Sequence, residues 1–287
     1  MGSKTSKAKR PSEEKRPTSA KTTVVIDSRI PRDIIDEILD HLAADSGPSI
    51  RTFRSHLRAC ALVSKSWIPP CRRHLFRTIY FTLKDMKRWL ETFPVPEESP
   101  AHYVRDLRFS IGKHDVAREK FFEYAPWFEN VERMGLYGHG SYEPLWMPPV
   151  WRLPQSITSL TIRTDTVTLT HLWAIMVQLP NLDELSLSGS LAAADGGKLV
   201  GIGATLGGRY GGKLELYRLD AGSVVDMLLE VPTGLRFTHL EIRGTHECFL
   251  PTVKLAEACS NSLVKLSYID DSYCKSHHLF RFWRERY

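Results

Sequence analysis

Residues 29–76 read RIPRDIIDEILDHLAADSGPSIRTFRSHLRACALVSKSWIPPCRRHLF, and this stretch decides how the chain is organised. Its first half places apolar side chains at helical spacing: Ile34, Ile35, Ile38, Leu39 and Leu42. At about 100° per residue they cover an arc of roughly 140°. Pro31 suits the first helical turn, where its missing N–H costs nothing. The pattern predicts an amphipathic helix with a broad apolar face.

A second helix is predicted over about residues 52–66, after a loop that contains Gly47 and Pro48. Its centre, residues 59–63, is apolar on every side, which indicates that other elements pack against it from more than one direction. We expect Pro69 and Pro70 to end this run, and residues 71–74 to form a basic turn. About fifty residues make a poor independent core. The stretch is therefore either a helical cap on the following domain or a docking wedge whose apolar face belongs to another protein.

These residues resemble the F-box, in the variant that is common in large fungal families. Pro31, Cys60, Val63 and Trp67 fall in the expected order, although the link between the first two helices is longer than usual. The resemblance implies a receptor that binds a Skp-type adaptor and, through it, a cullin. It also implies which residues contact the adaptor or support that contact, without separating the two roles: Pro31, Ile34, Ile35, Ile38, Leu39, Leu57, Cys60, Val63 and Trp67.

Beyond Phe76 the template apolar-x-x-apolar-x-apolar recurs eight times. Its middle residues lie 23 to 32 residues apart: Ile79, Leu107, Met134, Leu160, Leu185, Tyr217, Leu240 and Leu266. Each match predicts a strand. Helical or irregular connections are expected between them, at residues 84–90, 118–124, 170–179, 224–230 and 254–259. Near the end, Leu279, Phe280 and Trp283 predict either the apolar side of a capping helix or an exposed aromatic cluster.

The segment at residues 179–187, LPNLDELSL, resembles a leucine-rich repeat. The resemblance implies strands and helices that alternate along a curved solenoid. The usual Asn or Cys of each repeat is missing, so we expect an irregular arc; the alternative is an ordinary α/β domain with parallel strands. Side chains between the strand leucines would then line a concave surface and hold a protein substrate: Arg108, Arg133, Thr161, Glu184, Arg218, His239, Glu241 and Lys265.

The predicted fold class is therefore α+β, with a three-helix F-box at residues 24–76 and an irregular leucine-rich-repeat domain at 77–287. A glycine-rich stretch, residues 189–213, is expected to be a surface loop or a disordered insert. Residues 1–23 lack the apolar side chains needed to fold. They carry a net charge of +5 while the whole chain carries +6, so the remaining residues have no basic excess that would indicate nucleic acid.

The basic tail has three interpretations. Gly2 with Ser6 fits the N-myristoylation pattern, which would give a lipid anchor. The clusters at residues 7–10 and 15–16 fit nuclear import. The third interpretation is a solubilising tail. No apolar run is long enough to predict a membrane span.

We find no pattern that predicts an active site, a metal site or a cofactor. The five cysteines form no C-x-x-C pair and fit reduced thiols in the cytoplasm or nucleus. Gly201, Gly203 and Gly207 only partly match a dinucleotide fingerprint, because no helix is predicted after them. The leading hypothesis is a non-enzymatic substrate receptor of a ubiquitin ligase. The alternatives are a membrane-tethered or soluble repeat scaffold without a ligase role and, less favoured by the pattern, a nucleotide-binding enzyme.

Overall fold

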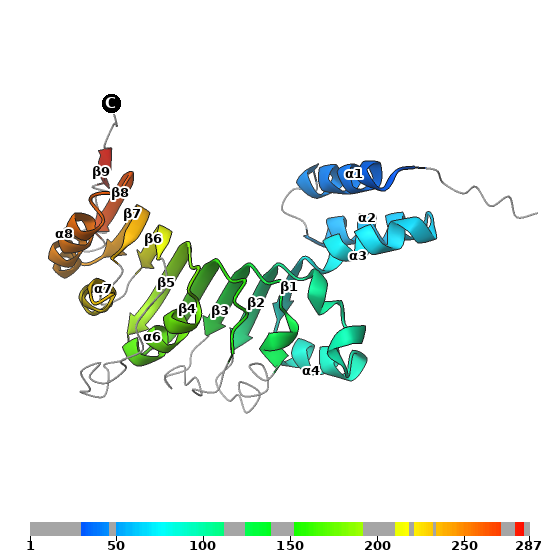
Figure 1. The fold of residues 1–287 in the computed structure, drawn as a ribbon, viewed down its shortest axis with the longest axis horizontal. Helices are drawn as coiled ribbons and strands as arrows, with labels where there is room; N and C mark the ends of the chain where they lie inside the picture. Colours follow the sequence, from blue (N-terminus) through cyan, green and yellow to red (C-terminus); the bar gives the residue numbers. More distant parts are fainter. Residues whose placement is uncertain are drawn as a thin grey trace, which may run out of the picture.

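The structure is a computed structural model, and it describes residues 30–45, 50–111, 124–138, 152–191, 210–217, 221–231, 234–270 and 279–283. Three helices precede a single sheet: α1 (Arg32–Asp45), α2 (Ile50–Ala61) and α3 (Ile68–Phe76). They lie together at one end of the molecule, beside the first strand (Figure 1). The predictions that fall on residues 1–29, including Gly2 and the tail, lie outside the described residues, and so do those on Gly201, Gly203 and Gly207.

The helix boundaries correct two expectations. The second helix ends at Ala61, so Leu62 and Val63 lie in a turn rather than inside a helix. Pro69 and Pro70 occupy the first turn of α3 instead of ending a helix. A helix tolerates proline there because the first amides have no partner within the helix. Residues 71–74, expected to be a turn, are therefore helical.

Eight strands form a parallel sheet in the order of the sequence, which confirms a mixed fold of helices and strands. All eight strands predicted by the recurring template are present: β1 (Thr78–Phe81), β2 (Asp106–Ile111), β3 (Arg133–Gly138), β4 (Ser159–Val167), β5 (Glu184–Leu191), β6 (Gly211–Tyr217), β7 (Arg236–Gly244) and β8 (Lys265–Asp270). Each strand pairs with the next one along the chain, so the sheet extends away from the three helices (Figure 1).

The register aligns the predicted middle residues, with one exception. Ile79, Leu107, Met134, Leu160 and Leu185 follow one another across the first five strands. In β6 the neighbour of Leu185 is Leu214, not the predicted Tyr217. The template did not select Leu214 as a middle residue because it requires an apolar side chain three residues earlier, where Gly211 stands. With Leu214 in place, the intervals between the eight aligned positions fall from 23–32 to 25–29 residues.

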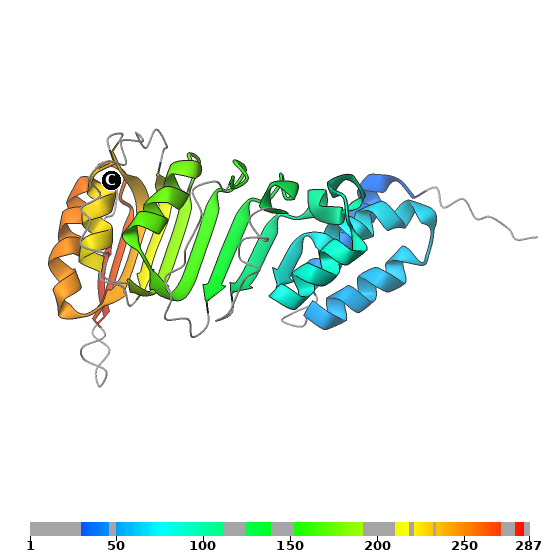
Figure 2. The same ribbon diagram turned by 90° about the horizontal axis from the view of Figure 1, so that it is seen from below.

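Four helices cover one face of the sheet (Figures 1 and 2): α4 (Leu83–Thr92), α6 (Leu169–Gln178), α7 (Ala221–Leu229) and α8 (Phe249–Ala258). Shorter 3₁₀ segments complete the connections: η1 (Lys65–Trp67), η2 (Pro96–Glu98), η3 (Pro100–Tyr103), η4 (Ala125–Trp127) and η5 (His246–Cys248). Alternate strand residues, such as Leu185 and Leu187, are buried beneath these helices. Burial of each such side chain stabilises the fold by about 1.5–3 kcal/mol.

The described residues form two separate hydrophobic cores. Ile35, Leu39, Leu57, Trp67 and Cys71 form a small core within the three helices. The large core begins at Ile79, continues through Tyr268, and has Phe76 packed against it. The boundary between the two cores thus falls at the end of α3.

The ends of the glycine-rich stretch belong to strands, not to a loop. Gly189 lies in β5 and has a φ of +137°, and a Cβ there would lie 1.5 Å from the Thr164 carbonyl oxygen. Gly212 lies in β6 at a register shift and has a φ of +67°. These positions need glycine because the backbone is left-handed or the next strand is too close. Residues 192–209 lie outside the described residues.

The last described element is a strand, so the expected capping helix is wrong. Residues Leu279–Trp283 form β9, which pairs antiparallel with β8, and Phe280 lies opposite Tyr268. Apolar residues that are close in sequence fit a helix face or a strand equally well over so short a run. The pairing covers an edge of β8 that would otherwise present unpaired amides and carbonyls.

Candidate functional site: an exposed apolar surface and an open sheet face

The two sides of α1 differ in exposure. Ile35 and Leu39 are buried, whereas Ile34 and Ile38 remain 41% and 38% exposed. These pairs lie on adjoining faces because residues four apart project in the same direction along a helix. Among the described residues, nothing covers the outer pair.

Further large apolar side chains are exposed on the three-helix unit, outside α1. Ile30 is 41% exposed, and Leu62 and Val63, in the turn after α2, are 88% and 65% exposed. We call Ile30, Ile34, Ile38, Leu62 and Val63 together the apolar surface. Ile30 and Leu62 were not among the residues expected to serve adaptor binding; for Leu62 the reason is that the sequence pattern placed it inside a covered helix. Large apolar side chains exposed in this number on a small unit indicate an interaction site.

The small core lies beneath the apolar surface and supports it. Its side chains include the thiol of Cys71, whose pKa burial raises to about 11, with the neighbouring Cys60 adding to the shift. Two ion pairs link α3 to α1: Arg73 Nη1 lies 3.4 Å from Asp36 Oδ2, and His74 Nε2 lies 3.7 Å from Asp40 Oδ1. Burial lowers the pKa of His74 despite the attraction of Asp40, so the second pair is weak at neutral pH.

The structure therefore sorts the nine residues expected to serve adaptor binding. Four of them are internal: Ile35, Leu39, Leu57 and Trp67. Cys60 is half-buried against the same core. The other four are exposed: Pro31, Ile34, Ile38 and Val63. The internal residues can only support a contact, and the exposed ones can make it.

A second candidate surface is the face of the sheet that no described helix covers, which we call the open face. Seven of the eight residues expected to line a substrate surface project from it in two neighbouring rows. One row contains Arg133, Glu184, His239 and Lys265; the other contains Arg108, Thr161 and Glu241. Arg218, the eighth, lies outside the described residues.

Many charges on the open face are paired with one another. Arg108 donates from Nε and Nη2 to the two carboxylate oxygens of Asp106, at 3.1 and 3.0 Å, and this pairing raises the pKa of Arg108. Arg133 Nε lies 3.6 Å from the same carboxylate. At the other end, Lys213 pairs with Glu215. The open face therefore carries positive and negative groups that hold one another in fixed positions, and neither sign of charge dominates it.

Hydroxyl groups extend this pattern. Tyr217 donates to Glu241 at 2.8 Å, and Ser159 donates to Glu184 at 2.9 Å. The pKa of Tyr217 is raised, first by burial and then by its bond to Glu241, so the phenol stays protonated as a donor. Residues from neighbouring strands thus hold one another in place across the open face.

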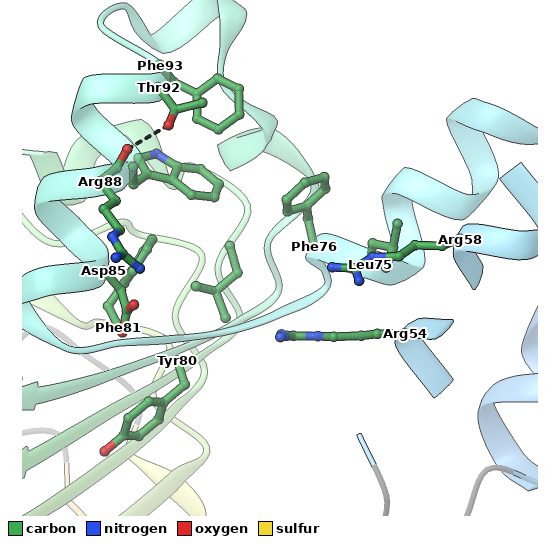
Figure 3. A pocket seen from close by; sticks show the side chains of 12 residues that line it. Arg54, Arg58, Leu75, Phe76, Tyr80, Phe81, Asp85, Arg88, Thr92 and Phe93 are labelled. Atoms are coloured by element: carbon green, nitrogen blue, oxygen red, sulfur yellow. Dashed lines mark hydrogen bonds between the residues drawn. The ribbon is translucent and has the colours of Figure 1, made fainter. Parts of the chain in front are cut away.

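Two cavities lie where the three helices meet the first strand. One, of about 480 Å³, is lined by residues of α2, α3, β1 and α4, including Arg54, Phe76 and Trp89 (Figure 3). The other, of about 470 Å³, includes Arg54, Arg77 and Tyr80. Both volumes are within the range of ligand sites. Sequence reasoning did not predict them, because a local pattern does not show how α2, α3, β1 and α4 pack around a common space.

Within the described ranges, no three His, Cys, Asp or Glu side chains come together as metal ligands. The thiols of Cys60, Cys71 and Cys259 are free. No helix in the described part of the chain is long and apolar enough to cross a membrane.

Neither a known protein-family model nor a curated protein matches this chain.

Proposed function

We propose that this chain is the substrate-recognition subunit of a ubiquitin ligase, in which an F-box binds a Skp-type adaptor and, through it, a cullin. The observation that carries the proposal is the apolar surface, where Ile34, Ile38, Leu62 and Val63 are exposed on a unit with its own small core. Fully burying such a side chain is worth about 1.5–3 kcal/mol, and a partner would recover the share that is still exposed: most of it at Leu62 and about two-fifths at Ile34 and Ile38. The F-box pattern of the sequence names the adaptor as that partner.

The sheet domain then holds the substrate. The leucine-rich-repeat interpretation is supported by eight parallel strands in chain order and by apolar residues aligned from Ile79 to Leu266. A mixed pattern of charges, such as Arg133, Glu184 and Lys265, suits a protein partner better than a phosphate backbone. The proposed mechanism is proximity, because the receptor turns a chance encounter into a held complex. The covalent chemistry belongs to other subunits, in the cytoplasm or the nucleus.

Binding to recombinant adaptor tests the proposal. We expect Ile34→Asp with Ile38→Asp to weaken adaptor binding by more than about 100-fold, since the apolar contact is lost and two carboxylates would have to be buried in the interface without partners. Both side chains are exposed in the free chain, so the variant should keep its unfolding midpoint. Isothermal titration of the full chain measures the affinity.

The matched control is Leu250→Asp with Val253→Asp. These residues also lie on one face of a helix, α8, and are 70% and 37% exposed. The same change of chemistry at the far end of the molecule should leave adaptor binding unchanged. If the wild-type chain does not bind adaptor, the receptor role is wrong and the scaffold interpretation replaces it. If both double variants bind adaptor as the wild type does, Ile34 and Ile38 do not make the contact.

A further inference from the structure

The first strand of the sheet has a free edge. The sheet begins at β1, which pairs only with β2 among the described residues. The amide of Asp106 donates to the Arg77 carbonyl at 2.9 Å. Because consecutive strand residues turn their backbone groups to opposite edges, Ile79 pairs with β2, and the N–H and C=O groups of Thr78 and Tyr80 point to the free edge.

The two cavities lie on either side of this edge. The cavity of about 480 Å³ is lined by Ile79 and Phe81, on the helix-covered face (Figure 3). The cavity of about 470 Å³ is lined by Thr78 and Tyr80, and Tyr80 is 48% exposed. They share three lining residues: Arg54, Leu75 and Tyr80. Together they form a groove around the free edge, which we call the β1 edge groove.

Basic side chains surround the β1 edge groove. Arg54, Arg58 and Arg88 line the first cavity, and Arg77 lines the second with Arg54. In the described part of the chain, none of these four arginines has an ion pair with a carboxylate. The groove thus presents a net positive charge to a ligand, although Arg88 also acts on the carboxylate of Asp85 in the same cavity.

Few acidic groups offset this charge. Asp85 is the carboxylate among the residues that line the first cavity, and it already accepts hydrogen bonds from the amide and the hydroxyl of Thr82. No carboxylate lines the second cavity, where Arg108 is bound to the neighbouring Asp106. The preferred ligand is therefore anionic.

The first cavity also has an aromatic floor, made by Phe76, Trp89 and Phe93. The ring centroids of Trp89 lie 6.0 Å from those of Phe76 and 5.0 Å from those of Phe93. The indole Nε1 of Trp89 is buried and has no acceptor among the described residues. This cavity therefore suits an apolar side chain, with a hydrogen-bond acceptor near the indole.

We propose that the β1 edge groove binds an extended acidic segment of a partner protein, which adds to β1 as a further strand. Successive side chains of such a segment point to opposite faces of the sheet. Every second side chain of the segment is apolar and enters the aromatic cavity. The side chains between them are acidic and face the arginines of the groove, Arg54, Arg58 and Arg77. The inference deepens the proposed function and rests on it, because the segment belongs to the captured substrate.

A labelled peptide tests the inference on the full chain. The probe is a capped peptide of about six residues, with alternating glutamate and leucine, and its fluorescence anisotropy measures binding. We expect saturable binding to the wild type and a loss on the order of tenfold or more with Arg54→Glu and Arg58→Glu. Both arginines are exposed, so the variant should fold.

The control variant is Arg152→Glu with Arg236→Glu, which reverses two exposed arginines that line neither cavity. We expect it to bind the peptide as the wild type does. An equal loss in both double variants would show that net charge alone attracts the peptide and would overturn the groove. Absence of binding to the wild type would overturn it as well.

Strand addition has its own test. Two further peptides carry N-methyl groups, either on the glutamates or on the leucines. A strand turns alternate amides toward β1, so one peptide should lose binding and the other should keep it. If both bind as the parent peptide does, or both fail, strand addition is wrong.

Adaptor binding is measured on the same preparations. Arg54 and Arg58 lie outside the apolar surface, so Arg54→Glu with Arg58→Glu should bind adaptor normally. Adaptor binding without peptide binding would overturn this inference alone, and peptide binding without adaptor binding would overturn the receptor role alone.

Discussion

Gly212 and Gly234 share a left-handed backbone, with φ angles of +67° and +75°, but only Gly212 is crowded. A Cβ at Gly212 would lie 2.1 Å from the Asp183 carbonyl oxygen, which accepts the Lys213 amide at 2.7 Å. No described atom lies within 4 Å of a Cβ at Gly234. Substitutions at the two glycines therefore separate the free-energy cost of a left-handed backbone from the cost of a steric contact.

We expect Gly234→Ala to lower the free energy of unfolding by about 1–2 kcal/mol, the cost of a left-handed L-residue. Gly212→Ala should cost about 1–3 kcal/mol more, because β5 and β6 must move apart. Urea denaturation of the two variants measures the difference. Equal losses would mean that the contact with Asp183 does not restrain β6.

At the scale of one element, α4 has a reciprocal cap. Thr82 Oγ1 accepts the Asp85 amide at 3.3 Å, and Asp85 Oδ2 accepts the Thr82 amide at 3.2 Å and its hydroxyl at 2.6 Å. The hydroxyl bond is the main reason that the pKa of Asp85 is lowered, and burial opposes it. A lowered pKa in the folded state stabilises the fold above the unfolded value of about 4, and this stability is lost as the pH falls through the folded pKa.

Thr82→Ala should therefore lower the free energy of unfolding by about 1 kcal/mol at pH 7, and by less at pH 3. Urea denaturation at the two pH values measures both effects. Thr92→Ala is the matched control, since its hydroxyl donates to the Arg88 carbonyl at the other end of α4 and involves no carboxylate. A pH-independent loss for Thr82→Ala would contradict the role of Asp85.

The elements also show what the sequence could predict. The repeated apolar template predicts all eight strands from β1 to β8. Its one error is in β6, where Leu214 and not Tyr217 lies beside Leu185. Two helix ends were misplaced, at Leu62 and Pro69, because a local pattern does not show that the chain turns here to bury Trp67 in the small core. The same limit applies to the site: Ile34 and Ile35 are chemically alike, and only the packed structure exposes one and buries the other.

At the scale of the whole molecule, two separate cores imply that the chain contains two parts that can unfold independently. The small core of Leu39 and the large core of Leu185 share no buried residue, and α3 joins them through Phe76. A unit as small as the three helices is marginally stable by itself. An exposed apolar surface on a marginal unit would let adaptor binding stabilise that unit without changing the sheet.

Leu39→Ala and Leu185→Ala test this independence, because they make the same change at side chains that are 0% and 1% exposed. Each should destabilise its own core by about 2–5 kcal/mol. Hydrogen exchange, read segment by segment, should then accelerate in residues 30–76 for Leu39→Ala and in the strands around β5 for Leu185→Ala. Adaptor binding should weaken only in Leu39→Ala, because only that variant loosens the support of Ile34 and Ile38. Exchange that accelerates throughout the chain in both variants would instead mean that α3 couples the cores into one cooperative unit.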